Sequence, residues 1–238
     1  MSLNASLTFQ DIRIDRTLSK EMYTLKFGSF FVKYFDEFFT DDVSLFFRIS
    51  YACNLIKESV NCGLLDWTHS TLVALHFANS EDNLDKLSQR DCVVWRIDLR
   101  DLNRNLPQKY REYLERKNTF VFSLDGLAEV ARDIRQYDAD MGDQAMVCFE
   151  PPSVDQRIVN QYSFFTAIPS GIRDLEAFLD THTENTVKYV IDKRLRWELR
   201  DILDQLNINE RMIHPGTAGI AKWLARHYYV KSGQPRED

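Results

Sequence analysis

The sequence predicts an α+β protein, in which a mixed or antiparallel sheet is packed by several helices. Runs of β-branched and aromatic residues bounded by turn residues predict four strands, at residues 92–99, 119–124, 145–149 and 186–191. Segments with apolar residues at helical spacing lie between and around these runs. Strands and helices do not alternate in a regular βαβ order, which favours the α+β class over a doubly wound parallel sheet.

The remaining elements follow from local pattern and turn chemistry. Residues 7–14, "LTFQDIRI", alternate like a strand, whereas residues 30–59 have helical character. A helix that begins after Ser153 is expected to run on through "SFFTAI", residues 163–168. Further helices are predicted at residues 108–117, 126–137, 173–182, 195–206 and 220–228. Residues 1–230 are thus expected to form one domain with a mainly helical N-terminal part, 1–60, and residues 231–238 a flexible tail.

Composition narrows the classes of function. The 238 residues carry a net charge of -6, which argues against sequence-independent binding of nucleic acid. A local basic group, that of Arg194, Arg196 and Arg200, is expected on a solvated helix face. Four cysteines without a CxxC pair, and no histidine at ligand spacing from them, predict no metal site. Neither a signal-type start nor a membrane-length apolar run is present, so a cytoplasmic location with reduced thiols and no membrane contact is expected.

The stretch at residues 61–80, "NCGLLDWTHSTLVALHFANS", combines polar residues with a nearly continuous apolar run. Apolar residues on all sides predict a buried helix at 69–78, with Trp67 largely covered. Asp66, Thr68 and Ser70 are residue types that cap a helix start, and this explanation needs no ligand. Alternatively, the same N-terminus receives a phosphate or nucleotide. His69 and His76, seven residues apart, lack a third ligand and are expected to be structural.

The segment "LLDWTHSTLVALHFA", residues 64–78, resembles the core motif of the FRG domain family, whose members read like PTRLLDWTxSPxxALYFA. Two later stretches resemble that family in the same order, "RIVNQYSFFT" at 157–166 and "MIHPGTAGIAKWLARHYY" at 212–229. The chain also departs from the family pattern. Residues 61–63, "NCG", replace Pro-Thr-Arg, Ile56 and Lys57 replace Gln-His, and no Phe-Arg-Gly tripeptide occurs; Arg48 lies closer to Asp66 than the family arginine does.

The resemblance implies an intracellular module of bacterial or phage-associated type, often near defence or mobile-element genes and without an established activity. The family's order of parts is similar to that of ADP-ribosyltransferase folds, which bind NAD. Two hypotheses therefore stand. The first is a binding or regulatory module that acts through an unknown protein partner. The second is an enzyme that handles a small nucleotide or NAD, with Asp66 and Gln161 as catalytic candidates and Trp67, Thr68, Ser70 and Arg157 as ligand-binding candidates.

The missing clamp residues favour the first hypothesis, because Asn61, Cys62 and Gly63 cannot replace the charge of an arginine opposite a phosphate. We accordingly expect Asp66 to be wholly engaged by backbone N–H groups and Gln161 by its neighbours, with no room left for a ligand.

Overall fold

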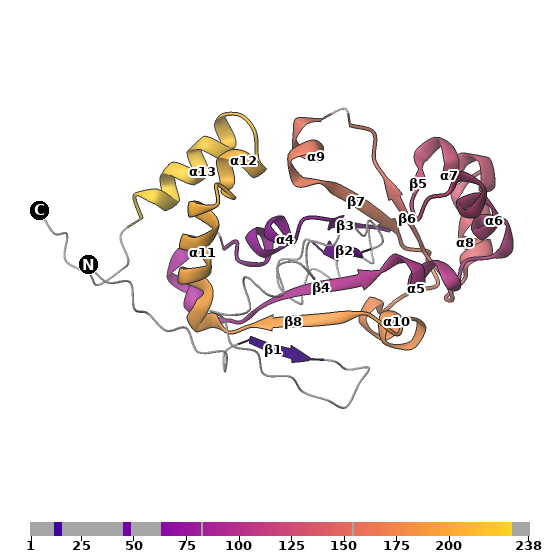
Figure 1. Cartoon of the computed structure of the whole chain (residues 1–238), viewed down its shortest axis with the longest axis horizontal. Coiled ribbons are helices and arrows are strands. Elements are labelled where there is room, and N and C mark those ends of the chain that lie inside the picture. The colour runs from indigo at the N-terminus through magenta and orange to yellow at the C-terminus, as the bar shows by residue number, and fades with distance from the viewer. Residues whose placement is uncertain (1–11, 16–44, 49–62, 82, 154, 230–238) are drawn as a thin grey trace, which may run out of the picture.

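The computed structural model describes residues 12–15, 45–48, 63–81, 83–153 and 155–229, which share one eight-stranded mixed sheet (Figure 1). The strand order is β1-β8-β4-β2-β3-β7-β6-β5, and every neighbouring pair is antiparallel except β5 with β6. The strands are β1 (Ile12–Asp15), β2 (Leu45–Arg48), β3 (Leu64–Thr68), β4 (Cys92–Asp98), β5 (Phe122–Ser123), β6 (Val147–Glu150), β7 (Ser163–Ala167) and β8 (Val187–Ile191).

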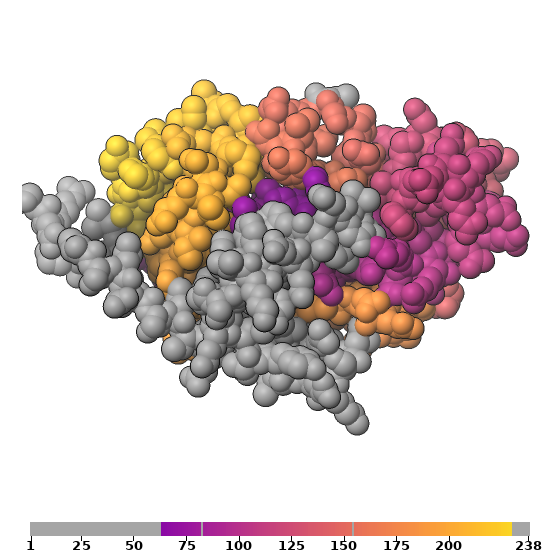
Figure 2. All heavy atoms as spheres, in the orientation of Figure 1, coloured from indigo at the N-terminus to yellow at the C-terminus, as the bar shows by residue number. Residues whose placement is uncertain are grey.

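Helices gather at both ends of the sheet. In Figure 1, α5 to α8 lie at one end and α11 to α13 at the other, and Figure 2 shows the same two groups in magenta and yellow at opposite ends of the surface. The helices are α4 (Thr71–Ala78), η2 (Leu84–Gln89), α5 (Leu99–Arg104), α6 (Gln108–Lys117), α7 (Leu124–Val130), α8 (Ile134–Met141), α9 (Gln156–Gln161), α10 (Leu175–His182), η3 (Lys193–Leu195), α11 (Arg196–Gln205), α12 (Glu210–Ile213) and α13 (Thr217–His227). No helix in these described segments is long and apolar enough to span a bilayer.

Strand β4 is covered on both of its faces, which explains its nearly continuous apolar sequence. Successive side chains of a strand point to opposite faces. Trp95 and Ile97 pack with α5 and α10, while Cys92 and Val94 pack with α4 and α11. The sheet is therefore held between helices, and α4 is fixed between β4 and the C-terminal helices.

The α+β class and the four strands named from the sequence are confirmed. β4, β5, β6 and β8 lie within or overlap the predicted ranges, although β5 has only two residues. The predicted helix at 69–78 is α4, whose side chains from Val73 to Ala78 are buried except for the half-buried Leu75. Trp67 is fully buried, as expected.

Three local predictions are wrong, because sheet pairing or a turn overrides helical pattern. Tyr162 ends α9 in the left-handed region, at φ 50°, and residues 163–167 form β7 between β3 and β6. The helix expected over 126–137 is interrupted between α7 and α8.

The third wrong prediction is local to residues 45–48, which lie in a segment expected to be helical, whereas the mainly helical character of residues 1–60 as a whole stays a prediction. The described residues of this N-terminal part form two strands. β1 overlaps the predicted strand at 7–14, and β2 lies inside the helical prediction for 30–59, where it pairs with β3 and β4. The other residues of that part, and the predicted tail 231–238, lie outside the described segments.

Candidate functional site

The residues singled out from the sequence are divided between the two faces of β3. Leu65 and Trp67 point to the core shared with α5 and α10, whereas Asp66 and Thr68 are on the opposite face. The indole Nε1 of Trp67 donates a hydrogen bond of 3.0 Å to Thr166 Oγ1. Trp67 is therefore a satisfied core residue, and its ring cannot stack on a ligand that contacts Asp66.

Thr68, Ser70 and Gln161 do come together, and their hydrogen bonds hold the backbone. Thr68 Oγ1 donates to the carbonyl of Gln161 over 2.7 Å and accepts from the Ser70 amide over 3.1 Å. Ser70 caps α4, because its hydroxyl accepts from the Val73 amide over 3.4 Å. These contacts join β3, α9 and the start of α4. They agree with the prediction that the polar residues of this stretch cap a helix.

Gln161 links the same group of elements to α12. Its buried side-chain amide donates to the Ile213 carbonyl over 3.2 Å, and the neighbouring Asn160 donates to Met212 over 2.6 Å. Arg157, on the same helix, is exposed and lies 4.0 Å from the Asp155 carboxylate. Asp66 is exposed on β3. Gln161 is thus engaged by its neighbours, as expected from the sequence.

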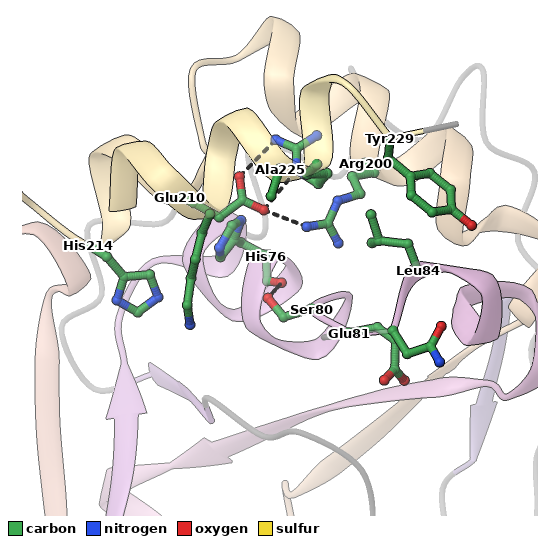
Figure 3. Close-up of a pocket in the computed structure, with 12 residues that line it drawn as sticks. His76, Ser80, Glu81, Leu84, Arg200, Glu210, His214, Ala225 and Tyr229 are labelled. Atoms are coloured by element: carbon green, nitrogen blue, oxygen red, sulfur yellow. Dashed lines mark hydrogen bonds and ion pairs between the residues drawn. The ribbon is translucent and has the colours of Figure 1, made fainter. Parts of the chain in front are cut away.

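The described residues also form a cavity of about 490 Å³ at the other end of α4, among α11, α12 and α13 (Figure 3). We call it the α4–α13 cavity. None of the residues singled out at 66–70, 157 and 161 lines it. Its lining residues are His76, Ser80, Glu81, Asn83, Leu84, Arg200, Glu210, His214, Lys222, Ala225, Arg226 and Tyr229.

A cluster of ion pairs forms one wall of this cavity. Glu210 accepts from Arg200 Nη2 over 2.5 Å and from Arg226 Nε and Nη2 over 2.7 and 2.8 Å. Arg226 also binds both carboxylate oxygens of Asp204, over 2.5 and 2.6 Å. Burial opposes ionisation of Glu210, but the Arg226 hydrogen bonds and the charge of Arg200 outweigh it and lower the pKa of that carboxyl to about 2. Two guanidiniums and two carboxylates therefore balance one another and connect α11, α12 and α13.

His76 is the most deeply placed ionisable side chain of the lining that has no ion-pair partner. Its residue is 5% exposed, and within the described chain neither ring nitrogen makes a hydrogen bond. In Figure 3 the His76 ring lies beside the Glu210 side chain, beneath the C-terminal helices. Burial is the main cause that lowers the pKa of His76 to about 4, with Arg200, His214 and Arg226 adding to it and Glu210 opposing it. At neutral pH the ring therefore offers one donor and one acceptor to the cavity.

Close backbone approach fixes the helices around the cavity. A Cβ atom on Gly219 of α13 would lie 1.8 Å from the His214 carbonyl oxygen and 2.5 Å from that of Glu210, so only glycine allows this contact. Val73 and Phe77 of α4 pack on Ile213, the last residue of α12. The α12–α13 pair therefore packs on α4, and His214 lies in the turn between α12 and α13.

The expectation of a solvated face at 194–200 is wrong for two of its three arginines. Arg196 and Arg200 are buried and bind the C-terminal end of α4. Arg196 Nε donates to the Asn79 side chain over 3.0 Å, and Arg200 Nη1 donates to the Asn79 carbonyl over 2.8 Å. The Asn79 carbonyl and the Glu210 carboxylate accept from the two terminal nitrogens of Arg200, whereas its buried Nε has no partner within the described residues. One signal of this arrangement is visible in the sequence, a histidine at position 76 inside an otherwise apolar helix.

No family model, curated protein or solved structure matches this chain. Within the described segments, no three His, Cys, Asp or Glu side chains gather where they would hold a metal ion. The described residues thus form two separate polar groups. One lines a cavity that contains a neutral, buried imidazole, and the other lies at β3, where its hydrogen bonds stabilise the fold.

Proposed function

We propose that this chain is a binding module of FRG-like type that takes a small polar molecule into the α4–α13 cavity. The observation that carries the proposal is His76, which is 95% buried yet has no hydrogen-bond partner in the described chain and lines a space of about 490 Å³. The ring nitrogens of His76 are not among the fully buried atoms that lack a partner, so they are accessible from the cavity, where a ligand or ordered water can satisfy them. The volume lies within the range of small-molecule sites.

The geometry at β3 supports a binding module over an enzyme of ADP-ribosyltransferase type. Thr68 and Gln161 direct their hydrogen bonds at backbone groups, and Trp67 points to the opposite face of the sheet from Asp66. A transferase would need these groups to converge on one open pocket. We propose, further, that a bound molecule regulates how the C-terminal helices meet a protein partner in the cytoplasm, in line with the FRG resemblance.

The test is a thermal-shift titration of the purified protein with nucleotides, NAD, sugar phosphates and small organic acids. A molecule that binds only the folded state at 100 times its Kd stabilises by about 2.7 kcal/mol, which raises the melting temperature measurably. We expect a saturable rise with at least one of these molecules. The rise should be lost in His76→Phe, which removes both ring nitrogens while keeping a ring of similar size.

His69→Phe is the matched control, because His69 is exposed at the other end of α4 and does not line the cavity. It should leave the shift unchanged. The proposal fails if no molecule gives a saturable shift. It also fails if NAD is bound or turned over in a way that Asp66→Ala and Gln161→Ala abolish and His76→Phe does not, since the NAD-enzyme hypothesis predicts that pattern.

A further inference from the structure

We infer that the ligand of the α4–α13 cavity carries an oxyanion, a phosphate or carboxylate group, and that Lys222 and His214 hold it. This inference rests on the proposed binding function and specifies its chemistry. It begins from the charges of the lining, which comprise three cations and two carboxylates in a chain whose net charge is -6.

The two arginines of the ion-pair cluster already have carboxylate partners. Glu210 is bound by Arg200 and Arg226, and Arg226 is bound in addition by Asp204. Lys222 is different, because within the described residues it forms no ion pair, although it lines the same cavity. Its ammonium group is consequently the cation that remains for an incoming anion.

His214 lies at the same end of the cavity as Lys222. Burial lowers the pKa of His214, and the charges of Lys222 on α13 and Arg157 on α9 lower it further, while Glu210 of α12 opposes them. His214 packs edge-to-face on Phe77, with 5.9 Å between ring centroids, and its ring makes no hydrogen bond to the described chain. The ammonium of Lys222 and the imidazole of His214 thus line the cavity together, and both are donors that phosphates and carboxylates bind.

The opposite end of the cavity carries a negative charge, that of Glu81. In Figure 3, His214 lies at one side of the cavity, whereas Glu81 lies beyond Ser80 on the other. Glu81 forms no ion pair within the described residues, and it would repel an anion from that side. His76 lies between the two, neutral at pH 7, where its donor and acceptor suit the uncharged body of a ligand. The cavity therefore orients an acidic molecule with its anionic group toward Lys222.

The experiment is calorimetric titration of the full chain with inorganic phosphate and, separately, with acetate, at fixed ionic strength maintained with sodium chloride. We expect saturable binding of at least one anion, and the stronger of the two identifies whether the group is of phosphate or carboxylate type. Lys222→Gln should weaken that binding about tenfold or more, since it removes the charge and leaves a polar side chain only one bond shorter. Lys222 is exposed, so this variant is expected to fold.

Lys193→Gln is the matched control, an exposed lysine outside the cavity that forms no ion pair within the described residues. It should bind like the parent protein. The inference is overturned if neither anion binds saturably, or if Lys222→Gln binds as well as Lys193→Gln. If an uncharged molecule binds through His76 while both anions fail, the oxyanion is wrong and the binding function stands; if nothing binds, both are wrong.

Discussion

Replacing Arg226 by alanine should lower the free energy of unfolding by about 3 kcal/mol. The guanidinium binds both carboxylate oxygens of Asp204 and both of Glu210, with only 10% of its side chain exposed. Its removal leaves the two carboxylates with one remaining guanidinium, that of Arg200, which pairs with Glu210 and not with Asp204. Urea denaturation followed by circular dichroism measures the change.

Arg132→Ala is the control for the loss of an arginine as such. Arg132 pairs with Asp133 over 3.4 Å, but its side chain is 85% exposed, so its removal should change stability by less than about 1 kcal/mol. Equal effects of the two substitutions would show that the cluster around Glu210 does not anchor α13 to α11 and α12.

Acidification from pH 6.5 to 4.5 should lower the free energy of unfolding by about 2 kcal/mol through His76 alone. Its pKa falls from 6.5 to about 4 in the folded protein, chiefly because of burial. Between these two values the unfolded chain binds the proton and the folded protein does not, so protons favour unfolding as the pH falls. Glu210 acts in the same direction but lower, since its stabilising charge is lost from about pH 4.5 down to its folded pKa of about 2.

His76→Phe isolates this contribution. The variant retains every other titrating group, so the difference between its pH profile and that of the parent over this range reports His76. The parent should lose about 2 kcal/mol more than the variant as the pH falls from 6.5 to 4.5. Parallel profiles would mean that His76 is protonated in the folded state, or is not buried, and would contradict the neutral imidazole on which the cavity's chemistry depends.

The sequence predicts a helix or strand correctly where the local residue pattern favours the same structure as the contacts with distant parts of the chain. α4 is one of them, because an apolar run on all sides of a helix after a serine cap has no other compact solution. β7 is the opposite case. The segment "SFFTA" continues a helical pattern, yet Tyr162 takes a left-handed conformation and the ladder with β3 and β6 decides the outcome. Backbone pairing with distant strands is not visible in a local window.

One part of the candidate site could be predicted from the sequence and the other could not, because only local interactions are visible in a sequence pattern. Capping chemistry identified Thr68 and Ser70, and the structure places both at the start of α4 together with Gln161. The cavity was missed, because its lining comes from residues 76–84 and 200–229, which no motif joins. Arg200 and Arg226 read as ordinary surface cations until their carboxylate partners are brought near. A buried ion cluster depends on helix packing, and spacing within one helix does not reveal it.

Histidine NMR distinguishes ligand binding at the α13 end of α4, which we propose, from binding at the N-terminus of that helix. His76 and His214 line the cavity, whereas His69 lies at the other end of α4, 4.8 Å from the ring of Tyr162, which follows Gln161. The imidazole resonances of these three residues can be followed during a titration with inorganic phosphate and then with NAD. We predict that phosphate shifts His76 and His214 saturably and leaves His69 in place. A saturable shift of His69 with NAD, while His76 and His214 do not move, would contradict this assignment.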